Sequence, residues 1–150
     1  MIKDNVQVKG QVQLILTGPD GKLKHKLVHN LVVDTGSAFI ASRMKDATKA
    51  AMSHIAVGTG NAAPAKAQTA LSNEIARAIL TSTTIVTTNA PNDAIQYLAT
   101  FAPGIGTGAI VEAAIFNASS VGEMLARTVF AVINKGALDT LTITWKVTVA

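Results

Sequence analysis

The segment Ser53–Pro64 carries the glycine spacing closest to a phosphate-binding loop. Gly58, Gly60 and Ala63 match the letters Gly-x-Gly-x-x-Gly/Ala after a short apolar strand. That fingerprint binds a dinucleotide when a helix follows, because the helix amino terminus meets the pyrophosphate. Here Pro64 and a polar, alanine-rich stretch follow instead. We therefore predict a structural turn at Gly58 and Gly60, where glycine permits a positive φ, and no bound cofactor.

The three histidines and the absence of cysteine bear on metal and nucleophile chemistry. His25 and His29 share one face of an expected strand but stand about 13 Å apart along it, too far for one ion. His54 begins another expected strand and is predicted to be structural. Without cysteine, the chain has no thiolate ligands, cysteine nucleophiles or disulfides. The sequence predicts no metal site, no catalytic residues and a protein that is not an enzyme.

Two charged residues interrupt otherwise apolar strands. Glu112 lies in "AIVEAAIF" and Arg127 in "MLARTVFAVI". Because such charges are seldom buried unless paired, we predict an ion pair within the fold. Arg77 is a competing partner for Glu112, and Glu74 is a further candidate for a structural ion pair. The alternative is that these charges contact a neighbouring subunit.

The overall charge does not favour a nucleic-acid or membrane partner. Charged residues make up 15% of the chain and the net charge is +4, with Lys22, Lys24 and Lys26 close together. This is too little for a general basic surface, so no direct nucleic-acid contact is expected. The longest uncharged run, 94–111, contains proline, glycines and polar residues, which argues against a bilayer helix. The first seven residues lack the apolar stretch of a secretory signal.

Hydrophobic periodicity predicts a mainly β chain with one inserted helix. Apolar and polar residues alternate over 6–16, and a type I turn at 18–21 returns the chain, so residues 1–33 are expected to form an amino-terminal hairpin. A helix is expected over about 36–51, with Ile40, Met44, Ala47 and Ala51 on its apolar face and Asp34 or Thr35 as cap. A short second helix is possible within 69–78.

The second half of the chain is rich in β-branched residues and is divided by turn signals. Many short strands at regular spacing favour an antiparallel β-sandwich or jelly-roll-like fold. Residues 1–150 are expected to form a single domain of this kind. The expected strands are 79–88, 94–102, 108–116, 123–134 and 139–149.

The expected strand 123–134 is apolar on both faces. In an antiparallel sandwich one face of a strand is usually solvated, so either the helix or another chain is expected to cover the second face. Leu125 and Val129 are therefore possible interface residues. Lys22, Lys24 and Lys26, in the exposed second strand of the hairpin, are the other candidates.

Taken in order, several strings resemble small structural proteins of tailed bacteriophages, of the capsid cement (decoration) type. No single motif is specific, and the likeness rests on the series, which covers the chain from about residue 28 to the end. The strings are "NLVVDTG" (30–36), "HIAVGTG" (54–60), "TALSNEIAR" (69–77), "IVEAAIFN" (110–117), "MLARTVF" (124–130) and "LTITWKV" (141–147).

The resemblance implies a jelly-roll-like, non-enzymatic virion protein on the capsid surface, made in the bacterial cytoplasm. Its expected partners are the major capsid protein and further copies of itself, as a homodimer or homotrimer that matches a symmetric shell. The resemblance also implies that Gly58 and Gly60 form a structural turn. The alternative is a phage tail component, such as a fibre adaptor or baseplate-associated module. A nucleotide-using enzyme is a third hypothesis.

Overall fold

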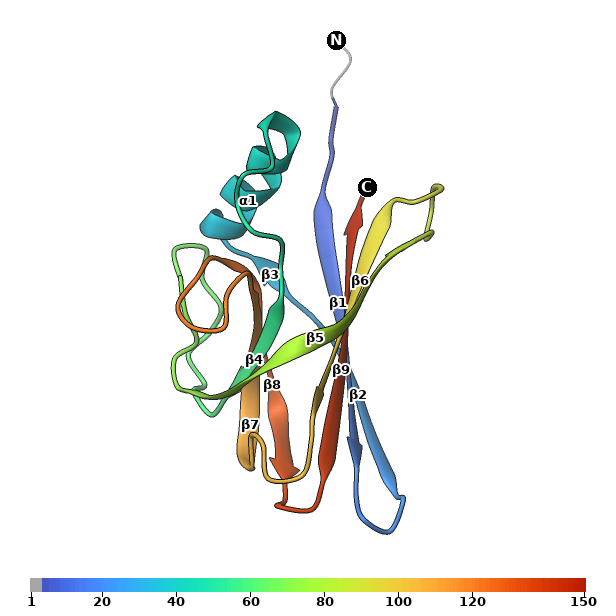
Figure 1. Ribbon diagram of the computed structural model, residues 1–150, viewed down its shortest axis with the longest axis vertical. Helices are drawn as coiled ribbons and strands as arrows, with labels where there is room; N and C mark the ends of the chain where they lie inside the picture. Colours follow the sequence, from blue (N-terminus) through green and yellow to red (C-terminus); the bar gives the residue numbers. More distant parts are fainter. Residues whose placement is uncertain (1–3) are drawn as a thin grey trace.

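The structure, a computed structural model, describes residues 4–150, so the first three residues of the expected hairpin region lie outside it. The chain forms nine strands and one helix (Figure 1). In order they are β1 (Val8–Thr17), β2 (Leu23–His29), β3 (Leu31–Val32), α1 (Asp34–Lys45), β4 (His54–Gly58), β5 (Glu74–Val86), β6 (Ala94–Phe101), β7 (Gly108–Phe116), β8 (Met124–Lys135) and β9 (Thr140–Val149).

All strand pairs are antiparallel, in the order β2-β1-β9-β6-β5-β4-β7-β8-β3. The long strand β5 belongs to two sheets, because residues 74–79 pair with β4 and residues 80–86 pair with β6. β5 is therefore a corner that joins the two layers, and Figure 1 shows it crossing the molecule diagonally. The expected antiparallel, mainly β fold with one helix is confirmed.

A second corner almost closes the sheet. β2 pairs with β1, whereas β3, which follows after Asn30, pairs with β8. Two hydrogen bonds continue this seam: the hydroxyl of Thr128 donates to the His29 carbonyl at 2.8 Å, and Lys26 Nζ donates to the Ala131 carbonyl at 2.9 Å. The amino-terminal hairpin thus ends at His29, before the expected limit of 33, because the chain there crosses to the other layer.

The core lies between the two layers and follows the alternation of the strands. On β9, Leu141, Ile143, Trp145 and Val147 are buried while the threonines between them are half-buried. The inner residues of β1, β4, β6, β7 and β8 pack into the same cluster. A smaller cluster lies on the outer face of the β4-β7-β8 layer and consists of Val33, Ala56, Leu71, Ala114, Phe116 and Met124.

A hydrogen bond from a buried tryptophan fixes the second corner. Trp145 Nε1 donates to Asn30 Oδ1 at 2.7 Å, and the Asn30 backbone N–H donates to the Gly10 carbonyl at 3.3 Å. Gly10 leaves the space for this side chain, because a Cβ there would lie 1.5 Å from Asn30 Oδ1. Trp145, which has no exposed surface, therefore has its polar group satisfied while its ring fills the core.

The helix is shorter than expected and is capped differently. It ends at Lys45 rather than near 51, and Ala47 shortly after it has a positive φ of 53°. The prediction that Asp34 or Thr35 caps it is wrong, since Val33 is the N-cap residue and makes no side-chain cap bond. The Thr35 hydroxyl instead donates to the Met124 carbonyl at 2.7 Å, which ties the first turn to β8.

The predicted apolar face of the helix is right at Ile40, which packs against the core, but wrong at Met44. Met44 is 85% exposed, whereas Gly36 and Phe39 are the buried residues of α1. Gly36 sets this orientation, because a Cβ there would lie 1.9 Å from the backbone oxygen of Leu125. The helix backbone approaches β8 so closely at this point that the face beginning at Gly36 must be the packed one.

The short helix considered within 69–78 is absent from the part of the chain that is described: Glu74–Val86 is the single strand β5. The expected strand at 79–88 therefore begins five residues earlier, because pairing with β4 extends it through Arg77. Within residues 4–150, no helix is long and apolar enough to cross a membrane.

We predict that Gly36→Ala destabilises the protein even though alanine favours helices by about 1 kcal/mol over glycine. The added methyl group collides with backbone, which cannot rotate away, so the net loss should be about 1 to 3 kcal/mol. Urea unfolding measures it, with Ser37→Ala at the neighbouring exposed helix position as the control. An unchanged or higher stability of Gly36→Ala would contradict the close approach.

Candidate functional site

The charged residues that interrupt the apolar strands form a salt bridge inside the protein. Glu112 on β7 and Arg127 on β8 both have 0% side-chain exposure, and Arg127 Nη2 lies 2.7 Å from Glu112 Oε2. Arg127 Nε donates to the same oxygen at 3.2 Å. Arg77, the competing partner considered for Glu112, pairs with Glu74 instead. Neither a neighbouring subunit nor a ligand is needed to satisfy the buried pair.

The glycine-rich loop surrounds the Glu112 carboxylate. The backbone N–H groups of Gly60 and Asn73 donate to Oε1 at 3.0 and 2.8 Å, and that of Ser72 donates to Oε2 at 3.0 Å. These N–H groups are the kind that cradle a phosphate in a nucleotide site. Here they already bind an anion of the protein itself, whose charge would repel a phosphate.

The reason proposed for the glycines at 58 and 60 is wrong. Neither has a positive φ, and Gly58 is the last residue of β4 rather than part of a turn. A Cβ would lie 2.5 Å from Glu112 Oε1 at Gly58 and 2.7 Å from it at Gly60. The nearest atoms are the Asn73 backbone oxygen, 2.4 Å from a Cβ at Gly58, and the Ser72 Cβ, 2.3 Å from a Cβ at Gly60. Both positions therefore need glycine because residues 72–73 and the carboxylate approach the backbone closely.

Arg127 fastens the far side of the same loop. Its Nη1 donates to the Ala62 carbonyl at 2.8 Å and to Gln68 Oε1 at 3.0 Å, and its Nη2 also donates to the Ser72 hydroxyl at 3.1 Å. Together with the bonds to Glu112, every N–H of the guanidinium has an acceptor. The pair thus holds residues 59–73 against the outer face of the β4-β7-β8 layer, over the smaller apolar cluster.

The hydrogen bonds decide the protonation state of Glu112. Burial by itself raises the pKa of the carboxyl, but the bonds from Arg127 and from the three backbone N–H groups outweigh it and bring the pKa below the ordinary value of 4.5. Glu112 is therefore ionised at neutral pH. A buried, ionised and fully hydrogen-bonded carboxylate is suited to hold structure and not to exchange protons.

The second ion pair fastens another loop. Arg77 Nε and Nη2 bind the two oxygens of Glu74 at 2.8 and 2.7 Å, a bidentate arrangement. Its Nη1 donates to the carbonyls of Ala118 and Val121, at 2.9 and 3.1 Å. The guanidinium also stacks over the Phe116 ring, 3.9 Å from the centroid. Arg77, on β5, therefore holds the turn between β7 and β8 from the other side of β4.

The predicted interface residues separate into buried and exposed ones. Leu125 is 2% exposed and belongs to the main core, so its assignment to an interface is wrong: α1 covers it. Val129 is half-buried. Lys22 and Lys24 are exposed, while Lys26 bonds to the Ala131 carbonyl. The second face of β8 is thus covered by the chain itself near Met124, and the basic side of the hairpin stays accessible.

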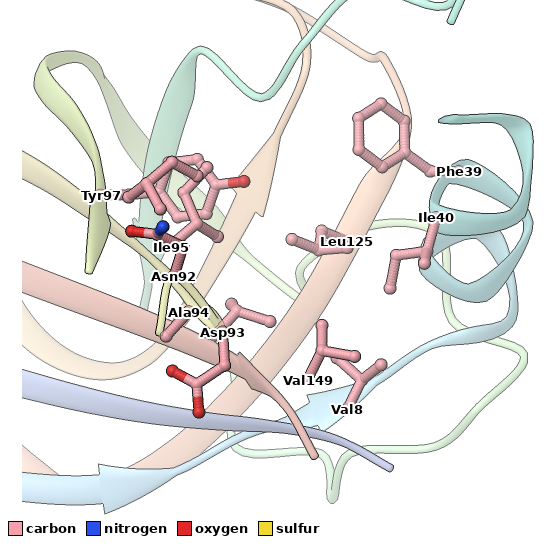
Figure 2. Close-up of a pocket in the computed structure, with 12 residues that line it drawn as sticks. Val8, Phe39, Ile40, Asn92, Asp93, Ala94, Ile95, Tyr97, Leu125 and Val149 are labelled. Carbon is pink, nitrogen blue, oxygen red and sulfur yellow. The ribbon is translucent and has the colours of Figure 1, made fainter. Parts of the chain in front are cut away.

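An apolar pocket of about 260 Å³ opens between α1 and the β1-β9-β6 layer (Figure 2). Phe39 and Ile40 line it from the helix, and Leu125 from β8. Figure 2 shows Val8 and Val149 on the strands beneath them and Tyr97 on the opposite side. The helix contacts β8 at Gly36, and beyond this contact only a few apolar side chains fill the space between α1 and the sandwich. The pocket is the space that they leave.

The pocket contains no acid–base pair poised near neutral pH. Burial raises the pKa of Tyr97 to about 12, so its hydroxyl stays protonated. Asp93 accepts hydrogen bonds from Ala90, Thr88 and Asn89, which lower the pKa of its carboxyl despite some burial. Its role is to fix the β5–β6 turn. The pocket can accept an apolar group, but these residues are not set up for proton transfer.

The histidines lie apart from one another. His25 contacts Gln13, and His54 Nδ1 lies 2.8 Å from the Ser53 hydroxyl. Burial, followed by the charge of Arg77, lowers the pKa of His54. Among the described residues no three His, Cys, Asp or Glu side chains are close enough to hold a metal ion.

Sequence reasoning missed two polar residues that hold the fold, the half-buried Asn30 and the buried Lys135. Asn30 holds the corner between the layers, and Lys135 is 2% exposed, with Nζ donating to the Ala102 carbonyl at 3.0 Å. Burial lowers the pKa of Lys135. A lysine at a strand end gives no sign of burial in the sequence, because its long stem reaches an acceptor that only the fold brings near.

Comparison of the chain with protein-family models, with curated proteins and with solved structures gives no match.

We predict that Glu112→Gln lowers the free energy of unfolding by about 3 to 5 kcal/mol, because it leaves the buried Arg127 charge uncompensated. Denaturant unfolding followed by circular dichroism measures the loss. Glu74→Gln is the matched control, and a smaller effect is expected because the Glu74 side chain is 32% exposed. Equal losses of unfolding free energy in the two variants would show that the buried Glu112 pair stabilises the protein no more than the partly exposed Glu74 pair.

The lowered pKa of Glu112 predicts an acid dependence of stability. A carboxyl whose folded pKa is depressed stabilises fully above its unfolded pKa, and this contribution is lost as the pH falls through the folded pKa. Between about pH 5 and lower values, the unfolding free energy of the natural chain should therefore fall more steeply than that of Glu112→Gln. Asp46 and Asp93, whose pKa values are also lowered, keep some acid dependence in both proteins. Parallel curves would contradict the assignment.

Proposed function

We propose that the protein is a non-enzymatic structural component of a tailed-phage virion, and specifically a capsid cement protein that binds the major capsid protein. The proposal starts from the resemblance of the sequence strings. The observation that supports it best is that the charged groups with the richest bonding, Glu112, Arg127 and Arg77, are engaged in holding loops onto the sandwich. A protein that reinforces a shell needs such a rigid scaffold and a binding surface, but no chemistry.

The basic side of the β1–β2 hairpin is the proposed contact with the shell. Lys22 and Lys24 are exposed next to the turn, at the end of the molecule away from α1 (Figure 1). Their charge fits an acidic surface on the partner and would favour encounter. Many copies bound on one symmetric shell would make weak individual contacts effectively strong.

The test is the copy number of the protein in purified virions, by quantitative mass spectrometry against the major shell protein. We expect a number comparable with that of the shell protein. A number many-fold lower would overturn the capsid assignment in favour of the alternative, a tail component such as a fibre adaptor or baseplate-associated module. Absence from virions would overturn both.

A copy number that agrees leaves the hairpin contact to be tested separately. Lys22→Glu with Lys24→Glu should weaken co-sedimentation with shells that lack the protein. Lys9→Glu with Lys66→Glu makes the same charge change away from the turn and should leave binding nearly unchanged. Equal binding by both double variants would contradict the hairpin as the contact.

A further inference from the structure

One stretch of sheet edge stays open where the two layers part. β5 pairs with β4 only as far as Ile79, and the Leu80 N–H makes the last bond on that side, to the Ser53 carbonyl at 2.8 Å. From Thr81 to Val86, β5 pairs with β6 alone, and no other strand of residues 4–150 pairs with its second edge. Its outer backbone N–H and C=O groups are thus available to another strand.

The side chains on this edge are unusual for an unprotected strand. All five residues from Thr81 to Ile85 are exposed, and no charged residue or proline lies between Arg77 and Ala90. Ile79 and Ile85, at 67% and 57% exposure, flank the threonines. Natural proteins usually guard such an edge with lysine, proline or a bulge that prevents pairing with other chains. Here a register irregularity lies between Leu80 and Ser82, at the start of the open stretch, and the residues from Ser82 to Val86 have no such protection.

The β2 edge, at one end of the strand order, is protected in the usual way. β2 carries Lys24 and Lys26, with Lys22 just before it, and Lys26 bonds across the seam to β8. A second copy placed along β2 would meet lysines of like charge. The contrast between a lysine-bearing edge at β2 and an uncharged one at β5 indicates that the β5 edge is used for pairing.

We propose that two copies of this protein associate through their β5 edges, by antiparallel pairing of Thr81–Val86 about a two-fold axis. The occupant is a second copy because the edge is self-complementary: it has no charge that would repel itself and it consists of β-branched and small polar residues. This inference does not rest on the proposed function. It would join the two β5 strands and their β6 neighbours into one continuous sheet.

The two-fold axis fixes which residues meet. If it passes by Thr83, that residue faces the same residue of the second copy, and Ser82 faces Thr84 of the second copy. Threonine pairs and pairs of β-branched residues are favourable across strands. Ile85, which also lines the apolar pocket, would lose exposed surface. Because one short strand pair buries less than a standard interface of about 1,600 Å², the dimer should be reversible.

The test is the molar mass of the full chain by light scattering and sedimentation over a concentration series that reaches the millimolar range. We expect the mass to rise to twice the monomer value. Thr83→Lys, which opposes two like charges at the axis, should remain at the monomer mass. Thr100→Lys, at an exposed threonine of the paired strand β6, is the matched control and should dimerise normally.

A charge exchange separates a lost interface from a damaged fold. Thr83→Lys and Thr83→Glu should each be monomeric, and an equimolar mixture of the two should regain the dimer mass. Circular dichroism checks that each variant is folded. A natural chain that stays monomeric over the whole series, or a dimer that Thr83→Lys and Thr100→Lys affect equally, would overturn the proposal.

Discussion

The buried pair of Glu112 and Arg127 is the interaction on which the outer layer of this protein depends. Burying two charges has a large unfavourable desolvation free energy, which is offset only when every donor and acceptor has a hydrogen-bond partner. The loop 59–73 supplies those partners through its backbone, so the loop and the pair require each other. The same requirement explains Gly58 and Gly60, where any side chain would collide with residues 72–73 of the loop and with the carboxylate.

Two corners convert nine strands into one nearly closed sheet. β5 passes from one layer to the other, and Asn30, held by Trp145, lets the β2–β3 segment do the same. Where the sheet is closed, its strands have no unpaired edge. The open stretch 81–86 exists because β4 is short and ends its pairing at Ile79, which leaves the far half of β5 without a neighbour. The architecture that protects most of the sheet therefore concentrates its exposed backbone at one place.

The distribution of polar groups determines which charged and polar side chains hold the fold. Glu112, Arg127, Arg77 and Asp93 hold loops and turns, and the neutral Tyr97 faces an apolar pocket. What remains available is surface: the lysines of the hairpin and the neutral edge of β5. These two surfaces are the ones through which we propose that the protein binds its partners.

The sequence by itself determined the strand pattern and the need for buried charges to be paired. The alternation of apolar and polar residues, and the presence of a charged residue within an apolar strand, can both be recognised in a short stretch of sequence. The sequence could not determine which residues contact one another in the fold. Arg127 rather than Arg77 pairs with Glu112 because β7 and β8 lie side by side, and the helix turns Gly36 rather than Met44 inward because Leu125 approaches its backbone. Likewise β5 begins at Glu74, where local signals allowed a helix, since pairing with β4 supplies the hydrogen bonds. Which glycine, asparagine or lysine is indispensable was decided by contacts between distant segments, and only the tertiary structure creates those contacts.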